Sequence, residues 1–142
     1  MAINIIQNAD ASGGLQGTDL DQGPILFVSS EYTASSVDKV FFVAPRRCIV
    51  KSITVRVEAA GTDAGAVSAV IKRAASGTAI GSGTALHSSS ANLKGTAATN
   101  QALTLSTTAA DLDIAAGTAI GIDFTGTLTA ATGVVTVALC PA

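Results

Sequence analysis

The sequence predicts an all-β fold, an antiparallel β-sandwich of about eight strands. From residue 25 onward, short runs rich in β-branched and aromatic residues recur at a spacing of roughly 8 to 15 residues, and Gly-rich turns separate them. No long stretch has helical periodicity. Residues 107–117, "TTAADLDIAAG", come nearest and predict at most one helical turn. A length of 142 residues suits one domain with a single core.

The composition limits both the core and the possible partners. Hydrophobic residues make up 48% of the chain but aromatic residues only 4%, so small aliphatic side chains must build most of the core. Charged residues make up 13%, about half of the usual quarter, and the net charge is −2. A nucleic-acid-binding face needs several Lys or Arg side chains to neutralise phosphates. Beyond the pairs Arg46-Arg47 and Lys72-Arg73 there is no basic cluster, so we expect no nucleic-acid partner.

The chain divides into residues 1–24 and residues 25–142. Residues 7–24, "QNADASGGLQGTDLDQGP", are rich in Gly, Asp, Asn and Gln and cannot bury enough apolar surface to offset the entropy of ordering. We expect residues 1–24 to form a flexible or extended N-terminal arm and residues 25–142 to form the β-sandwich. The first residues lack a basic start followed by a long apolar run, so we expect no secretory signal.

A few apolar residues of the arm are candidates for contact with a partner. Three isoleucines form a small, partly alternating patch at its tip, and one leucine lies farther along. Two interpretations stay open: a frayed terminus, or a strand added to the sheet edge of a neighbour. Under the second interpretation, the partner-binding residues are Ile3, Ile5, Ile6 and Leu15.

The first three predicted strands follow the arm. Residues 25–30, "ILFVSS", and 38–45, "DKVFFVAP", are short β-branched and aromatic runs, and Pro45 stops the second. Residues 48–59, "CIVKSITVRVEA", alternate most clearly, with Ile53, Val55 and Val57 predicted to face the core. Lys51 falls on the apolar face of that alternation, which predicts a β-bulge between residues 50 and 52.

The later strands are shorter. "GTDAG" at residues 61–65 is a turn by composition, and "AVSAVIKRA" at 66–74 follows with alternate residues inward, so residues 48–74 predict a hairpin. Residues 76–90 form a loop-rich stretch with one short strand near 85–88, and residues 101–107 predict a strand through two leucines. Residues 119–126, "AIGIDFTG", alternate, with Gly121 and Asp123 outward. The two leucines are Leu103 and Leu105, and the predicted inward residues are Val67, Ala69, Ile71, Ile120, Ile122 and Phe124.

The last nineteen residues, "FTGTLTAATGVVTVALCPA", carry no charge. Their few strongly apolar residues would supply only about −2 to −4 kcal/mol toward membrane insertion, and several Thr, two Gly and a Pro oppose it. "VVTVALC" alternates and is β-branched, whereas "TGTLTAATG" is turn-like. The tail therefore predicts a hairpin ending in a core strand, and we expect no membrane anchor.

No catalytic, cofactor or metal site is predicted, and we expect the protein not to be an enzyme. His87 is the single histidine and lies among serines, which is typical of an ordinary surface residue. The Gly-rich residues 77–86 lack the ending of a phosphate-binding P-loop. Aspartates at 19, 21, 38, 111 and 113 have no calcium-loop spacing, and two Cys with one His have no zinc-ligand spacing.

Cys48 and Cys140 lie far apart in the sequence without a CxxC motif. With nothing that indicates export, we expect buried free thiols, and a single disulfide is the alternative.

The predicted outward faces carry Thr, Ser, Ala and Gly more often than Lys or Glu. Monomeric sheets usually carry charge on their edges and faces to prevent association. This thin protection favours a homo-oligomer, for which closed rings of two or three chains are the simplest solution. The alternative is a modestly polar domain that Thr and Ser keep hydrated.

Three segments resemble small head decoration (cement) proteins and related virion proteins of tailed bacteriophages. They are "VFFVAPRRCIVKSITVRVEAAGTDAG", "VIKRAASGTAIGSGTAL" and "LDIAAGTAIGIDFTGTLTAATGVVTVAL". The resemblance spans roughly residues 40–141 and is carried by Ala44-Pro45, the "GTDAG" turn, the "AAGTAIGID" strand entry and the final "GVVTV" strand. Thr118 stands where an acidic residue is expected in that family's pattern.

The resemblance implies a jelly-roll-like sandwich and a structural role. Such proteins bind the outer surface of the capsid, often as homotrimers at three-fold axes, and clamp neighbouring capsomers. The implied partners are the major capsid protein and further copies of the chain, and the implied location is the virion, assembled in the bacterial cytoplasm. The alternatives are a head-fibre base, a tail adhesin component, or a carbohydrate-binding module centred on Tyr32.

Overall fold

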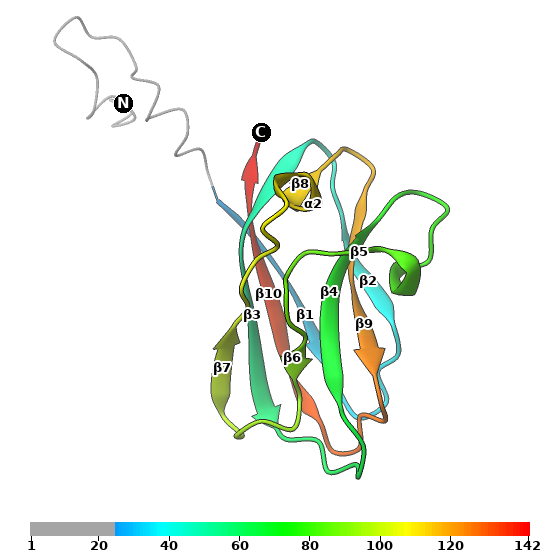
Figure 1. Ribbon diagram of the computed structural model, residues 1–142, viewed down its shortest axis with the longest axis vertical. Coiled ribbons are helices and arrows are strands. Elements are labelled where there is room, and N and C mark those ends of the chain that lie inside the picture. Colours follow the sequence, from blue (N-terminus) through cyan, green and yellow to red (C-terminus); the bar gives the residue numbers. More distant parts are fainter. Residues whose placement is uncertain (1–24) are drawn as a thin grey trace, which may run out of the picture.

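The computed structural model describes residues 25–142, which form two antiparallel sheets packed face to face (Figure 1). The predicted all-β sandwich is therefore confirmed. The predicted arm, with its candidate residues Ile3, Ile5, Ile6 and Leu15, lies outside the described residues.

The first sheet has the strand order β1-β10-β3-β7, with the short β8 also paired to β3. The second sheet has the order β2-β9-β4-β5, with β6 also paired to β4. The bounds of the first sheet are β1 Leu26–Tyr32, β10 Thr132–Pro141, β3 Cys48–Ala59, β7 Thr99–Ala102 and β8 Asp113–Ile114. Those of the second are β2 Lys39–Val43, β9 Ala119–Thr125, β4 Ser68–Ala74, β5 Thr84–Ala85 and β6 Ala91–Asn92.

The connections give the jelly-roll order. The first strand pairs with the last strand in one sheet, and the second strand pairs with the penultimate strand in the other. Two short helices lie in the connections: η2 Ile80–Ser82 and the single turn α2 Ala109–Leu112, which was predicted. Residues 25–142 form ten strands rather than about eight, because three two-residue strands (β5, β6 and β8) add to the longer ones.

Two predicted hairpins are wrong. β3 and β4 lie in opposite sheets, and so do β9 and β10, so neither pair is joined by a hairpin turn. The loop over residues 61–65 crosses between the sheets, where Gly61 N–H donates to the Leu93 carbonyl oxygen at 2.8 Å and Thr62 N–H donates to that of Thr129 at 2.9 Å. Composition marks a turn but does not say whether the chain folds back or crosses the sandwich. β10 is nevertheless a central strand, as expected for the end of the chain.

The alternation predicted for the longest strand is confirmed. Ile53, Val55 and Val57 are fully buried, and the residues between them are more exposed. The register between β3 and β10 shifts at Lys51, which is the extra residue of the predicted β-bulge. Ile and Val side chains from the two inward faces form one core, joined by a few Leu and Ala.

In the second sheet the inward residues of β4 and β9 are buried as predicted, except that Phe124 is only partly buried. Gly121 was predicted to point to solvent but is buried. Ile80 of η2 covers it, so closely that a side chain at Gly121 would overlap the isoleucine. The strand predicted through Leu103 and Leu105 ends earlier, at Ala102 in β7, and Leu103 continues with one bond to β3.

The prediction of a surface histidine is wrong. His87 is 5% exposed and lies between β5 and β6, where it fills a gap in the pairing of β4. Ile71 N–H donates to His87 Nε2 at 2.8 Å, so His87 Nδ1 carries the proton and donates to the Ser89 carbonyl oxygen at 2.7 Å. Burial lowers the pKa of His87, which keeps the ring neutral. Its role is structural.

Candidate protein-docking edge

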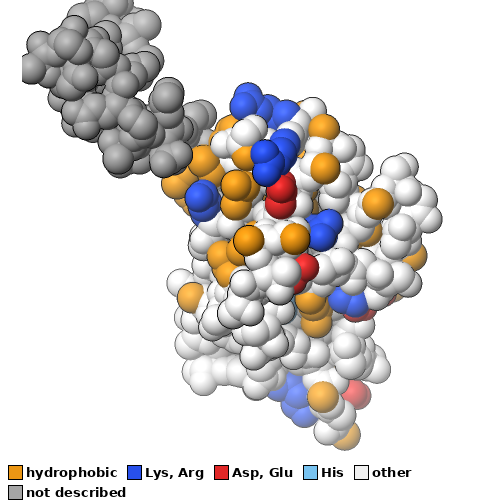
Figure 2. Space-filling view, turned by 45° about the horizontal axis from the view of Figure 1, so that its top comes forward, with side chains coloured by type: hydrophobic (Ala, Val, Ile, Leu, Met, Phe, Trp, Pro, Cys, Tyr) orange, Lys and Arg blue, Asp and Glu red, His pale blue; other side chains and the backbone are white. Residues whose placement is uncertain are grey.

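The exposed large hydrophobic side chains of residues 25–142 gather on or beside the first two strands. Ile25, which precedes β1, and Leu26 and Phe27 at its start are 54%, 45% and 65% exposed. Val40 and Val43 of β2 and Val37 in the loop before it complete the group. Figure 2 shows orange side chains gathered at the upper left of the coloured part of the molecule. Exposed apolar groups of this kind mark interaction surfaces.

The backbone of β1 is open along its outer edge. Leu103 N–H donates to the Ile53 carbonyl oxygen, which directs the backbone of Ile53 toward β7. The backbone groups of successive residues point to alternate sides of a strand. The neighbours of Ile53 in β3 therefore bond to β10, and alternate residues of β10 bond to β1. Hence Leu26, Val28 and Ser30 bond to β10, and the residues between them point away from it.

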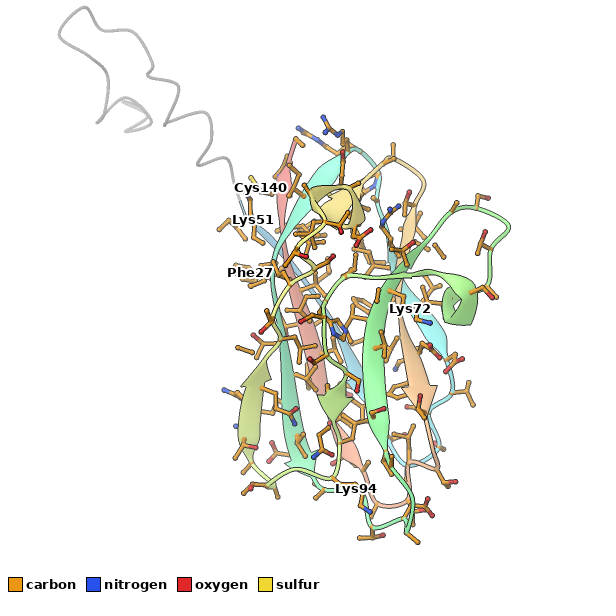
Figure 3. The ribbon with its side chains drawn as sticks, in the orientation of Figure 1. Phe27, Lys51, Lys72, Lys94 and Cys140 are labelled. Carbon is orange, nitrogen blue, oxygen red and sulfur yellow. The ribbon has the colours of Figure 1, made fainter. Side chains whose placement is uncertain are left out.

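One observed contact agrees with this assignment. Lys39 Nζ of β2 donates to the carbonyl oxygen of Glu31, which therefore faces the open edge. The next two outward residues, Phe27 and Ser29, have no backbone hydrogen-bond partner among residues 25–142. Phe27 also points its side chain away from the sheet, beside Lys51 and Cys140 (Figure 3). β1 thus offers both open backbone groups and an exposed aromatic ring.

An apolar hollow of about 80 Å³ adjoins the start of β1. It lies where the ends of the two sheets meet, with walls from β1, β2, β3 and β10, and has room for about one aliphatic side chain. The lining residues are Leu26, Phe42, Pro45, Arg46, Cys48, Leu139 and Pro141.

A second hollow, of about 310 Å³, lies at the other end of β1 and is more polar. Tyr32 lines it but is only 1% exposed, so its ring offers no stacking face for a sugar. The Tyr32 hydroxyl donates to the Arg56 carbonyl oxygen at 3.2 Å, and burial raises the pKa of Tyr32 to about 12. The Arg56 guanidinium is engaged within the protein, by Glu58 at 2.8 Å and the Ala98 carbonyl oxygen at 3.0 Å.

Two further ion pairs also serve the fold. Arg47 makes a bidentate pair with Asp113, with Nε and Nη2 at 2.9 and 2.8 Å from the two carboxylate oxygens, and holds the pKa of Asp113 below its usual range. Lys72 Nζ lies 2.6 Å from the Asp123 carboxylate and also donates to the Gly81 carbonyl oxygen. One residue of each basic pair noted in the sequence, Arg47 and Lys72, thus holds loops and strands together.

Cys48 and Cys140 are buried and free, as predicted. Cys48 lies opposite Pro141 and Cys140 lies opposite Ile49, so the two thiols point to opposite faces of the first sheet. Burial raises the pKa of the Cys48 thiol, which makes it a poor nucleophile.

Residues 25–142 contain no group of three or more His, Cys, Asp or Glu side chains placed to hold a metal ion. In the same residues, no helix is both long and apolar enough to cross a membrane.

The partner-binding residues predicted from the sequence lie in the arm, and the exposed edge of β1 was not predicted. A signal was present, because "ILFV" carries apolar residues on both faces of the strand, whereas a half-buried strand needs them on one face only. Comparison with family models, curated proteins and solved structures finds no match to the chain.

Proposed function

We propose that the chain is a non-enzymatic structural protein that works in a larger protein assembly, as a decoration protein on the outer surface of a phage capsid. The observation that carries this proposal is the open, apolar edge of β1. An exposed strand with unpaired backbone groups and a 65% exposed Phe would promote aggregation of an isolated domain. In an assembly, the same strand can bind a neighbouring protein.

The capsid partner comes from the resemblance of residues 40–141 to phage decoration proteins. The jelly-roll order and the internal use of charged groups by Arg47, Arg56 and Lys72 accord with a structural role. Binding to the mature shell, but not to its dissociated parts, would stabilise the shell by mass action. Many copies on one lattice would multiply a modest contact.

In this proposal, residues 1–24 reach the capsid protein through Ile3, Ile5, Ile6 and Leu15, and the sandwich carries contacts between copies. The test is incorporation into particles. A tagged full-length chain is expressed during phage growth, and the fraction that bands with the particles is measured. We expect I3S/I5S/I6S to reduce incorporation, and the matched polar changes Asn4→Ser and Asn8→Ser to leave it unchanged. Equal incorporation of all chains would refute the role of the arm.

Protease protection supplies a second readout. Cleavage within residues 1–24 should be fast in the free protein and slow on particles. Equal cleavage rates in the two states would contradict a clamp made by the arm.

A further inference from the structure

We propose that the open edge of β1 binds the same edge of a second copy of the chain, in antiparallel pairing about a two-fold axis centred on Val28. The two first sheets would then join into one continuous sheet. This contact can be tested apart from capsid attachment, because the test needs only the purified chain.

The first argument is that β1 is the unprotected edge. It pairs with β10 over all seven of its residues without a bulge, and Glu31 at its far end is its sole charged residue. The other sheet edges among residues 25–142 are shorter, since β2 has five residues, β7 has four, and β5, β6 and β8 have two each. The β2 edge is also interrupted by a register shift between Val40 and Phe42. Long, regular, uncharged edges are the ones that pair with another strand.

The second argument is that the edge is complementary to itself. The two residues with free backbone groups, Phe27 and Ser29, lie symmetrically about Val28. In an antiparallel pair centred there, Phe27 of each copy faces Ser29 of the other, and each such pair exchanges both of its backbone hydrogen bonds. A two-fold contact requires this reciprocity.

The third argument is that this register brings apolar groups together without opposing like charges. The two Val28 side chains face each other on the inner side, and the two Phe27 rings are diagonal neighbours on the outer side. Glu31 lies opposite Ile25 of the second copy rather than opposite another Glu31. The Glu31 carbonyl oxygen, which already accepts from Lys39, has a second lone pair for the N–H of Ile25 of the second copy, so both bonds can form.

The test is the mass of the purified full-length chain over a concentration series, by sedimentation equilibrium. We expect a monomer–dimer equilibrium. Ser29→Pro removes the outward N–H without touching the bonds to β10, and should weaken the dimer by about tenfold or more. Ser29→Ala keeps the N–H and is the matched control, which should dimerise like the original chain.

A second pair of variants keeps the test decisive if Ser29→Pro disturbs folding. Phe27→Lys adds a charge to an exposed side chain and should also abolish the dimer. Val37→Ser changes the most exposed of these side chains, 74% exposed but away from the edge, and should have no effect.

The register is tested by cross-linking. Opposed residues in a non-hydrogen-bonded pair have Cα atoms about 4.5 Å apart, which a disulfide can span. Val28→Cys should therefore give an oxidised dimer whose linked peptides each contain residue 28, as identified by mass spectrometry. Ser30→Cys should not, because the two residues at position 30 lie too far apart.

A monomer at every concentration, a trimer, a dimer that survives both Ser29→Pro and Phe27→Lys, or no cross-link through residue 28 would each overturn the proposal. The two tests are separate, because the dimer is measured on the purified chain and incorporation is measured on particles.

Discussion

The two strands that begin the described chain, β1 and β2, are both sheet edges and both apolar, yet they differ in how they are protected. β2 contains a register shift between Val40 and Phe42, and its Lys39 covers only the far end of the β1 edge, at the Glu31 carbonyl oxygen. β1 runs regularly along β10 and leaves the backbone of Phe27 and Ser29 open. The comparison teaches that backbone regularity, rather than overall hydrophobicity, distinguishes the edge that we propose to accept another strand.

The largest expected effect is a difference in stability between proline substitutions on the two sides of β1. Ser30 N–H bonds to β10, so Ser30→Pro should destabilise the fold by about 3 kcal/mol, because it removes a ladder bond and leaves a carbonyl of β10 unpaired. Ser29→Pro should change stability by less than about 1 kcal/mol, because the Ser29 N–H faces the open edge. Urea unfolding of both variants measures the difference. Equal destabilisation would show that the open side of β1 is wrongly assigned.

The next-largest loss of stability is expected at the C-terminal end of β1, where Tyr32 is buried. Gly133 of β10 lies opposite Tyr32, and a Cβ at that position would overlap the Arg56 carbonyl oxygen and the Tyr32 hydroxyl. We expect Gly133→Ala to cost about 2 kcal/mol and to loosen Tyr32. Loss of stability in urea should accompany a changed tyrosine fluorescence. A neutral result would mean that this end of β1 is as loosely held as its start.

A smaller change in stability, which depends on pH, is expected from His87, which packs against the second sheet. Because burial lowers the pKa of folded His87 below its ordinary 6.5, the unfolded chain binds more protons below that pH. Stability should therefore be constant just above pH 6.5 and decline as the pH falls toward 5. His87→Leu should flatten this decline and cost about 1–3 kcal/mol at neutral pH, because Ile71 N–H loses its acceptor. Thermal unfolding across this range provides the measurement. An unchanged slope in the variant would assign the pH dependence to other groups.

The smallest effect is expected at Asp113, which pairs with Arg47 on the surface. Asp113→Asn should lower the melting temperature slightly at low salt and hardly at all in concentrated salt, because exposed ion pairs are screened. A salt-independent loss would indicate that the pair holds β8 in place by more than its charge.

The sequence was sufficient for features set by local pattern. Alternation identified the inward residues of β3, and one lysine on the wrong face located the β-bulge at Lys51. Pairing was not predictable in the same way, because the turns at residues 61–65 and 126–131 have hairpin compositions but cross between sheets. The burial of His87 was not predicted, because no local sequence pattern shows that the loop carrying it fills the gap in the pairing of β4. The open edge depends on which strands become neighbours, and that is a property of the whole fold.

The measurement that tests the central claim most directly is the copy number of this chain in particles. A lysate that contains the protein is fractionated on a gradient, and the chain is quantified against the major shell protein of the banded phage-like particles. A decoration protein should be present at a ratio within a few-fold of one. A trace ratio would point instead to a fibre base or adhesin, and complete absence from the particles would contradict the proposed function.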